Sequence, residues 1–222
     1  MTHFSSDTFR FLGDLTGFRD KQWFDANRSR YEAHVLEPMR SLVSVIGAQL
    51  REQVPDMEIR PQVNKCITRI NRDMRFARGK SPYKDHMLAL FYREGRKKED
   101  PQLFVGIQPT EVWVGLYLSP PFLASDSAIA RAVQDRPDRV VALGRALGIG
   151  EDLMLGSCSR YGEIENSMNG GDAEHYVTGP HLCAMRIFPA NEVAADPADF
   201  VEEATEILTR LVPLWRAYLE GI

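Results

Sequence analysis

The stretch that decides the fold reads MLALFYREGRKKEDPQLFVGIQPTEVWVGLYLS and covers residues 87–119. It contains three apolar runs, at 87–93, 103–108 and 111–119, with polar residues between them. Short apolar runs bounded by turn residues predict β-strands. Only Pro109 and Thr110 separate the last two runs, which indicates a β-hairpin with a tight turn.

Two further stretches extend this sheet. Residues 63–76, VNKCITRINRDMRF, begin with β-branched residues and predict a strand before the first run. Residues 182–188 predict a last strand. We therefore expect a central, mainly antiparallel sheet of about 4–5 strands.

The first part of the chain predicts helices. Asp7 or Thr8 is placed to cap a short helix that ends at Leu15. Asp20 is placed to cap a second helix, in which apolar residues recur at gaps of three, four and seven. Pro38 lies inside that run, so we expect a kink or a break there.

Helices return after the hairpin. The sequence predicts helices over 126–134, 137–147 and 197–219, while residues 156–179 are rich in Gly, Ser and Asn and are expected to be irregular. Helices at both ends of a central antiparallel sheet indicate an α+β fold. No linker or repeat interrupts the chain, so we expect a single domain over residues 1–222.

Composition excludes several classes of protein. The chain has 222 residues, 44% hydrophobic and 26% charged, which argues against disorder. No apolar run approaches the ~20 residues of a membrane span. The chain has three cysteines, an odd number, and they are widely spaced: Cys66, Cys158 and Cys183. The N-terminus has no signal-peptide pattern. We therefore expect free thiols and a cytoplasmic protein.

Charge is segregated along the chain. Residues 60–98 hold 12 basic and 3 acidic residues, a net charge of +9, whereas the whole chain carries −4. The rest of the chain therefore carries −13. A basic segment in an acidic protein produces a local positive potential that attracts anions.

The centre of this basic segment is RINRDMRFARGKSPYKDH, residues 69–86. Arginine forms planar bidentate contacts with phosphate or carboxylate, and lysine adds a mobile point charge. A tyrosine can stack on a ligand or donate its hydroxyl hydrogen. The candidate ligand-binding residues are Arg69, Arg72, Arg75, Lys80, Tyr83 and Lys84.

The reaction, if there is one, is not evident. Asp73 can orient the neighbouring arginines or act as a base, and His86 and Glu94 are the other nearby acid–base candidates. His175, His181 and Cys183 match no standard zinc spacing. We therefore expect no metal and no cofactor, and we leave open whether the protein is an enzyme.

The central stretch also carries a resemblance. Arg69-Ile70-x-Arg72-Asp73-x-Arg75-Phe76, followed by Lys80-Ser81-Pro82-Tyr83-Lys84, resembles the RIxRDxRFSKDKxPYK signature of a widespread bacterial and fungal family of uncharacterised proteins. The opening FLGDLTGFRDKQWFDANRSRYEAHVLEP and the late Pro213-Leu214-Trp215 are similar to that family as well. The chain departs from the signature at residues 77–79, which read Ala-Arg-Gly. The resemblance implies a shared fold and site location, and no reaction.

Together these observations predict an anionic ligand, bound in an arginine-lined pocket built on residues 69–84. The ligand is a phosphorylated metabolite, a nucleotide or a nucleic-acid backbone. Two alternatives stay open. The basic segment could dock an acidic partner protein or a second copy of this chain, or its charges could form an internal ion-pair network without catalytic activity.

Overall fold

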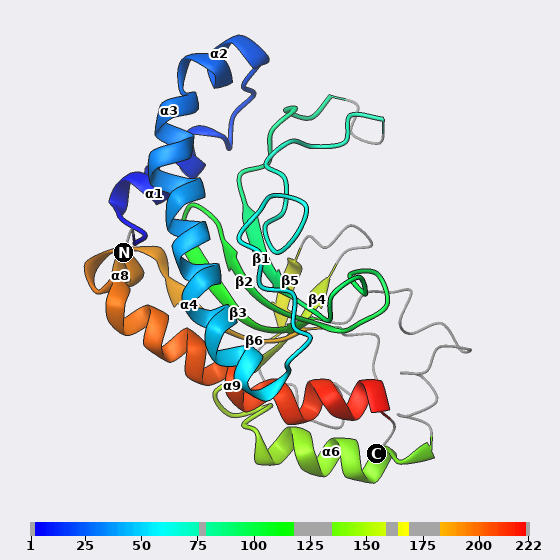
Figure 1. Cartoon of the computed structure of the whole chain (residues 1–222). Coiled ribbons are helices and arrows are strands. Elements are labelled where there is room, and N and C mark those ends of the chain that lie inside the picture. Colours follow the sequence, from blue (N-terminus) through cyan, green and yellow to red (C-terminus); the bar gives the residue numbers. More distant parts are fainter. Residues whose placement is uncertain (1–2, 76–78, 118–134, 159–163, 169–182, 221–222) are drawn as a thin grey trace.

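In the computed structural model, a curved antiparallel sheet carries its main helices on one face (Figure 1). The structure describes residues 3–75, 79–117, 135–158, 164–168 and 183–220. Within these ranges the sheet has six strands in the order β1-β2-β3-β6-β4-β5, and neighbouring strands pair antiparallel. The strands are β1 (Met87–Phe91), β2 (Gln102–Ile107), β3 (Glu111–Tyr117), β4 (Met154–Cys158), β5 (Ile164–Met168) and β6 (Cys183–Pro189).

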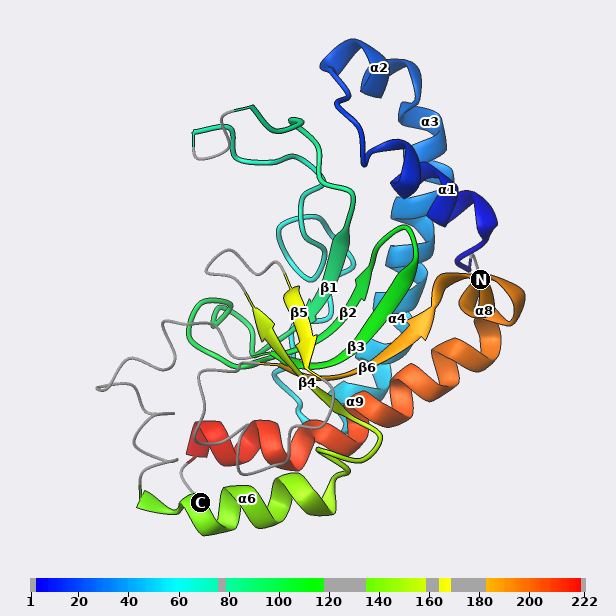
Figure 2. The ribbon, with the colours of Figure 1, turned by 180° about the vertical axis from the view of Figure 1, so that it is seen from behind.

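The helices come from both ends of the chain. α4 packs against β1, α9 packs against β2 and β3, and α6 lies on α9 (Figure 2). The N-terminal helices are α1 (Ser6–Asp14), α2 (Lys21–Ala26), α3 (Arg28–Tyr31), the π-helix η1 (Glu32–Leu36) and α4 (Glu37–Gln53). The later ones are α6 (Pro137–Ala146), α8 (Ala190–Ala195) and α9 (Pro197–Glu220). The α+β class, with helices from both termini around the sheet, is confirmed.

Alternation along the strands divides the sheet into two apolar faces. In β2, Leu103, Val105 and Ile107 belong to the main core under the helices. Phe104 faces the other way and joins a second apolar cluster with Trp113 of β3. The predicted hairpin of β2 and β3 therefore forms with the expected alternation of side chains.

Pro38 explains how the first helices join. A proline has no N–H, so it cannot donate to the carbonyl oxygen four residues earlier. That oxygen belongs to His34, and it accepts a hydrogen bond of 2.5 Å from the Thr8 hydroxyl instead. The chain passes through η1 before Pro38, which then occupies the first turn of α4. The expected interruption at Pro38 therefore takes the form of a π-helical segment, and it ties α1 to η1.

Two helix caps were predicted with different success. Asp20 caps α2, since its carboxylate accepts a 2.8 Å hydrogen bond from the backbone N–H of Trp23. At α1 the predicted caps Asp7 and Thr8 were wrong by two or three residues. Ser5 is the N-cap, and the Thr8 side chain accepts a hydrogen bond from its backbone N–H in a capping box.

The predicted strand over residues 63–76 was wrong. In its described part, residues 63–75, the chain makes only isolated bridges, at Val63, Ile67 and Asn71. Asn64 adopts a left-handed conformation (φ 73°), which turns the chain sharply and prevents a regular strand. Beyond the turn, the segment still lies beside β1. The backbone N–H of Thr68 donates a hydrogen bond to the carbonyl oxygen of Leu88, and the N–H of Leu90 donates one to the carbonyl oxygen of Cys66.

The sheet gains strands elsewhere. β5 and residues 156–158 of β4 lie in the stretch 156–179 that was expected to be irregular, and the two strands raise the strand number above the expected 4–5. The helix predicted over 126–134 lies outside the described residues. Residues 137–147 and 197–219 are helical nearly as predicted, in α6 and α9.

Two other expectations bear on the environment of the protein. None of the helices that the structure describes is long and apolar enough to cross a membrane. Cys66 is a free, buried thiol, but Cys183 is disulfide-bonded. The expectation that all the thiols are free was therefore wrong at Cys183.

Candidate functional site: a projecting basic arm

All six of the predicted ligand-binding residues lie on one structural feature, which we call the basic arm and define as residues 69–75 and 79–84. Figures 1 and 2 both show this segment projecting from the start of β1, away from the sheet. Its two sides are joined by an antiparallel bridge between Asn71 and Tyr83. Two backbone hydrogen bonds of 2.8 Å flank the bridge, from Arg72 N–H to Pro82 and from Lys84 N–H to Ile70.

The arm is attached to the N-terminal helices at its base. The ring of Tyr83 stacks on Phe24 of α2, with 4.1 Å between ring centroids and 8° between planes. The Ser81 hydroxyl lies 3.3 Å from both the backbone N and the carbonyl O of Arg19. Tyr83 is buried, and burial raises the pKa of its hydroxyl. The ring of Tyr83 is thus committed to packing, and its contact with a ligand stays a prediction.

Register decides which arm cations lie together. The paired residues 70–72 and 82–84 place Arg72 and Lys84 on the same face of the arm, at diagonal positions. Diagonal side chains in an antiparallel pair are about 7–8 Å apart at Cα, within reach of long side chains. The Arg72 Nε donates to the carbonyl oxygen of Ser81 at 3.3 Å, which orients the guanidinium group.

The other arm cations are spread along its length. Arg69, Arg75 and Lys80 are exposed. The Arg69 Nε donates to the side-chain oxygen of Asn64, at the base of the arm. Arg75 lies six positions further along the chain and pairs with Asp73, so Arg69 and Arg75 are held by different partners.

Asp73 and Arg75 form a local ion pair. Nε and Nη2 of Arg75 donate to the carboxylate at 3.0 and 2.6 Å, and the Arg75 backbone N–H donates at 3.1 Å. These bonds lower the pKa of Asp73 to about 2. A carboxyl group with so low a pKa is a poor proton acceptor at neutral pH, so this geometry suits the orienting role better than the role of a base.

His86 lies where the arm meets the sheet. Its Nδ1 is 3.0 Å from Oδ1 of Asp85, and its side chain is 15% exposed. The hydrogen bond with His86 lowers the pKa of Asp85, and the charge of Arg72 lowers it further. The charge of Arg72 therefore acts on the carboxylate of Asp85.

Across the sheet, this end carries further polar groups that the sequence did not single out. Continuing the register of β1 and β2 by one residue sets His86 opposite Gln108. Glu111 accepts hydrogen bonds from Gln108 at 2.8 Å and from the Trp113 indole N–H at 3.2 Å. This position of Gln108 follows from the strand register, which the sequence leaves open.

The ends of the basic segment are part of the fold. Arg60 forms a two-pronged ion pair with Glu58, whose side chain is 2% exposed. Although burial raises the pKa of Glu58, the bonds from Arg60 outweigh it and the net pKa is lowered. Arg93 binds buried Asp100 in the same way. These charges support the internal-network interpretation for the ends of the segment, while the centre lies at the surface.

The remaining acid–base and metal candidates add little to the site. Glu94 pairs with Arg51 at 2.8 Å, at the other end of β1. Over the described ranges, no three His, Cys, Asp or Glu side chains gather as metal ligands would. His175 and His181 lie outside the described residues.

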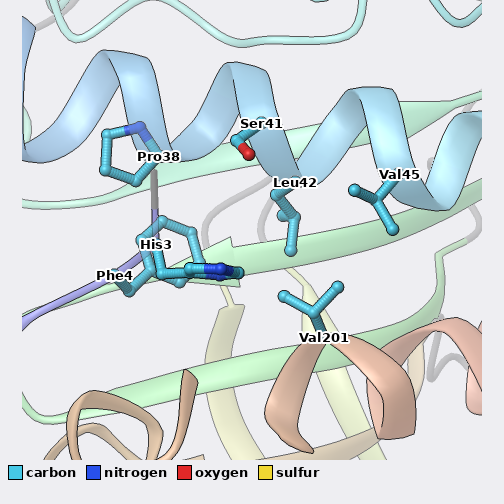
Figure 3. Close-up of a pocket in the computed structure, with 7 residues that line it drawn as sticks. All are labelled: His3, Phe4, Pro38, Ser41, Leu42, Val45 and Val201. Carbon is cyan, nitrogen blue, oxygen red and sulfur yellow. The ribbon is translucent and has the colours of Figure 1, made fainter. Parts of the chain in front are cut away.

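A pocket lies elsewhere, between the N-terminus, α4 and α9 (Figure 3). It holds about 10 Å³, roughly the space of one water molecule. Its lining is mostly apolar and contains no Lys or Arg, namely His3, Phe4, Pro38, Ser41, Leu42, Val45 and Val201. This pocket therefore does not suit the predicted anion.

The sequence of the chain matches a known protein family. Residues 7–216 match the family described as Conserved hypothetical protein (DUF2461). The chain belongs to this family. The match includes the whole basic arm and the helices at both ends, which confirms the resemblance seen in the sequence. A comparison with curated proteins gives no match.

Proposed function

We propose that the protein binds an anionic ligand through the basic arm. The observation that carries this proposal is the pairing of residues 70–72 with 82–84, which sets Arg72 and Lys84 on one face. Arg69, Arg75 and Lys80 add exposed positive charge on either side of that pair. Phosphate groups are the natural partners of such a set, because arginine and lysine bind them by charge-assisted hydrogen bonds.

A thermal-shift panel tests the proposal. The probes are inorganic pyrophosphate, nucleotides, sugar phosphates and heparin, the last as a long polyanion. A probe at 100 times its dissociation constant adds about 2.7 kcal/mol of stability. We expect at least one probe to stabilise the protein, and a double variant, Arg72→Gln with Lys84→Gln, to lose the effect.

Lys98→Gln is the matched control. It removes a positive charge from the same basic segment, at an exposed residue outside the arm. It should retain the stabilisation. If no probe stabilises the protein, or if Lys98→Gln abolishes the effect as fully as the arm variant, the proposal fails.

A second candidate function, acid–base catalysis, is favoured by the Asp85–His86 pair. A carboxylate bonded to one imidazole nitrogen fixes the ring and leaves the other nitrogen to exchange a proton with a substrate. Hydrolysis of bis(p-nitrophenyl) phosphate tests it. His86→Gln should lower the rate by at least about 100-fold, and His34→Gln should not. Absence of turnover by the wild-type protein would remove this candidate.

Docking of an acidic protein partner, or of a second copy of the chain, competes with the anion proposal. Size-exclusion chromatography at low and moderate salt separates the two. Docking would be favoured if the protein self-associates at low salt and dissociates at moderate salt, while no phosphate probe raises its thermal stability.

A cytoplasmic location also stays a proposal. Persistent disulfides are rare in a reducing cytosol, so the disulfide at Cys183 counts against this location, which predicts instead that Cys183 is reduced in cells. Trapping thiols by alkylation at the moment of lysis, followed by mass spectrometry of the Cys183 peptide, tests this. An oxidised Cys183 would contradict it.

A further inference from the structure

The connection between α1 and α2 lies beside the basic arm. Figures 1 and 2 both place α2 and the arm at the same end of the molecule. The contact runs through Ser81, whose hydroxyl lies 3.3 Å from both the backbone N and the carbonyl O of Arg19. The carbonyl oxygen of the same Ser81 accepts the hydrogen bond from Nε of Arg72. Ser81 therefore sets the chain at Arg19 beside the arm at Arg72.

The residue before Arg19, Phe18, presents its ring to solvent. The side chain is 68% exposed, and in the described part of the chain no other ring packs against it. Among the large apolar side chains that the structure describes, the other exposed one is Met74 on the arm, at 44%. Single exposed apolar residues are ordinary, but these two directly precede Arg19 and Arg75 at one end of the molecule. Apolar and cationic groups therefore alternate there.

The charge of Arg19 is not neutralised by a carboxylate. Its guanidinium group lies over the ring of Trp23, 5.2 Å from the ring centroid, and its Nη1 donates to the carbonyl oxygen of Phe18 at 3.2 Å. Its Nε is buried and has no hydrogen-bond partner among the described residues. Within the same ranges neither Arg19 nor exposed Lys80, the neighbour of Ser81, has an ion-pair partner. Both charges are therefore available to an anion beside Phe18.

An exposed ring next to available cations matches the chemistry of a nucleobase joined to phosphate. Bases stack on aromatic side chains, while arginine and lysine bind the phosphates. Inside a duplex the faces of a base are covered by its neighbours, so a protein ring stacks on unpaired bases. Provided that the proposed function holds, we infer that its anionic ligand is a single-stranded nucleic acid. One base stacks on Phe18, and the adjoining phosphates lie on Arg19 and Lys80.

The arrangement of the cations favours a strand over a free nucleotide. A nucleotide carries its phosphates at one point, whereas a strand presents a phosphate for every base. Arg72 and Lys84 lie on the paired part of the arm, apart from the chain at Arg19, and add positive charge for the phosphates that follow. Sites for single strands combine such a basic track with rings on which bases stack.

Fluorescence anisotropy on the full chain tests this inference. The probes are a labelled ten-nucleotide deoxyadenylate strand, an abasic strand of the same length and the deoxyadenylate strand paired with its complement, all in about 0.1 M KCl. The abasic strand keeps every phosphate, so its comparison with deoxyadenylate measures the contribution of the bases alone. We expect deoxyadenylate to bind at least about fivefold more tightly than either other probe. A riboadenylate strand then identifies DNA or RNA as the better source of the base.

Variants at Phe18 assign this preference to the ring. Phe18→Leu should weaken binding of deoxyadenylate at least about fivefold and leave the abasic strand unchanged. Phe18→Trp keeps an aromatic ring and should retain the preference. The high exposure of Phe18 means that neither change should affect folding.

Charge variants give a different pattern. Lys80→Gln should weaken both strands alike and lower the slope of log K against log salt by about 0.7. Lys98→Gln removes an exposed charge outside the arm and should change either affinity by less than about twofold.

The outcomes separate this inference from the proposed function. If pyrophosphate or heparin binds through Arg72 and Lys84 but deoxyadenylate binds no better than the abasic strand, the inference is wrong and the proposed function stands. Equally tight binding of the duplex or of adenosine monophosphate would also overturn it. So would Phe18-dependent sedimentation with phosphatidylserine vesicles in the absence of any preference for bases, which would indicate a lipid surface. If no anion binds, both fail.

Discussion

At the scale of single residues, Asp100 is the acidic group on which the connection between β1 and β2 depends. Its side chain is 1% exposed and accepts three hydrogen bonds from Arg93, at 2.8, 2.9 and 3.0 Å. Asp100→Ala removes both carboxylate oxygens, and with them all three hydrogen bonds, and leaves a half-buried guanidinium group without these acceptors. We expect a loss of about 2–3 kcal/mol in the free energy of unfolding, measured by urea denaturation.

The neighbouring residue supplies the control for this prediction. Glu99 pairs with Arg96, but both side chains are more than half exposed. Exposed pairs are screened by water, so Glu99→Ala should cost less than about 0.5 kcal/mol. Equal losses for the two variants would mean that burial does not decide the strength of these pairs.

Cys66 gives a second prediction at this scale. Its thiol is fully buried and donates to the carbonyl oxygen of Glu58 at 3.0 Å, and burial raises its pKa to about 12. The thiolate is the reactive form, so iodoacetamide should leave Cys66 unmodified in the native protein at pH 8. In urea the same residue should react fully. Mass spectrometry of the Cys66 peptide measures both, and rapid native labelling would contradict the buried position.

The sequence identified the cations of the basic segment but could not sort them. Arg60 and Arg93 pair with the buried carboxylates of Glu58 and Asp100, whereas Arg69 lies at the surface. In the sequence all three are arginines in one basic run. Glu58 is only two residues from Arg60 and Asp100 only seven from Arg93, but the sequence does not show that these carboxylates are buried, which only the fold decides.

At the scale of elements, two strand glycines allow close packing of the sheet. A Cβ on Gly106 of β2 would lie 2.7 Å from Leu88 Cδ2 and 2.8 Å from Trp113 Cε3. A Cβ on Gly115 of β3 would fall on the Ala184 carbonyl oxygen and lie 2.7 Å from the Met185 Cα. The new Cβ of Gly106→Ala would overlap side chains, which can shift. The new Cβ of Gly115→Ala would overlap the backbone of β6, which cannot shift without disturbing the pairing of β3 with β6.

These contacts predict an order of stability. Gly106→Ala should cost about 1–3 kcal/mol, and Gly115→Ala more, because it separates β3 from β6. Gly13→Ala is the control, since a Cβ there meets nothing within 4 Å and lies in helix α1. It should be neutral or stabilising by up to about 1 kcal/mol. Thermal unfolding of the three variants checks the order, and a harmless Gly115→Ala would refute it.

Elements with strong local patterns were predictable and others were not. The hairpin of β2 and β3 follows from alternation around Pro109-Thr110, and α9 follows from its helical spacing. Residues 63–76 have strand composition, but the left-handed turn at Asn64 breaks their path. β4 and β5 lack the apolar runs that mark a strand, and they form because β6 supplies pairing partners for β4.

At the scale of the whole molecule, the fold separates the charges that the sequence concentrates. Near the ends of the basic segment, Arg60 and Arg93 pair with the buried carboxylates of Glu58 and Asp100, while the centre of the segment lies on the arm, which is attached by the Tyr83–Phe24 stack. The candidate site could thus be predicted as a stretch of residues but not as a shape. An arm and a pocket have the same sequence signature, because the motif specifies charge and turns without specifying what surrounds them.

Stability in alkaline solution reports on the core as a whole. An acid whose pKa is raised in the native state keeps its proton while the unfolded chain loses it, so stability falls with pH between the two pKa values. For Cys66 this interval runs from about 9 to about 12, and for buried Tyr31 from about 10 to about 12. Each such group lowers the free energy of unfolding by up to about 1.4 kcal/mol per pH unit within its interval.

Two variants assign this fall to particular groups. Between pH 9 and 10 the curve for Cys66→Ala should be flatter than the wild-type curve, whereas Tyr31→Phe should flatten it only above pH 10. Burial lowers the pKa of Lys97, which acts in the opposite sense in all three proteins, so comparison of their slopes isolates each acid. Urea denaturation at half-unit steps from pH 8 to 11 measures the slopes. A Cys66→Ala curve as steep as wild type below pH 10 would mean that the thiol is not held protonated by the core.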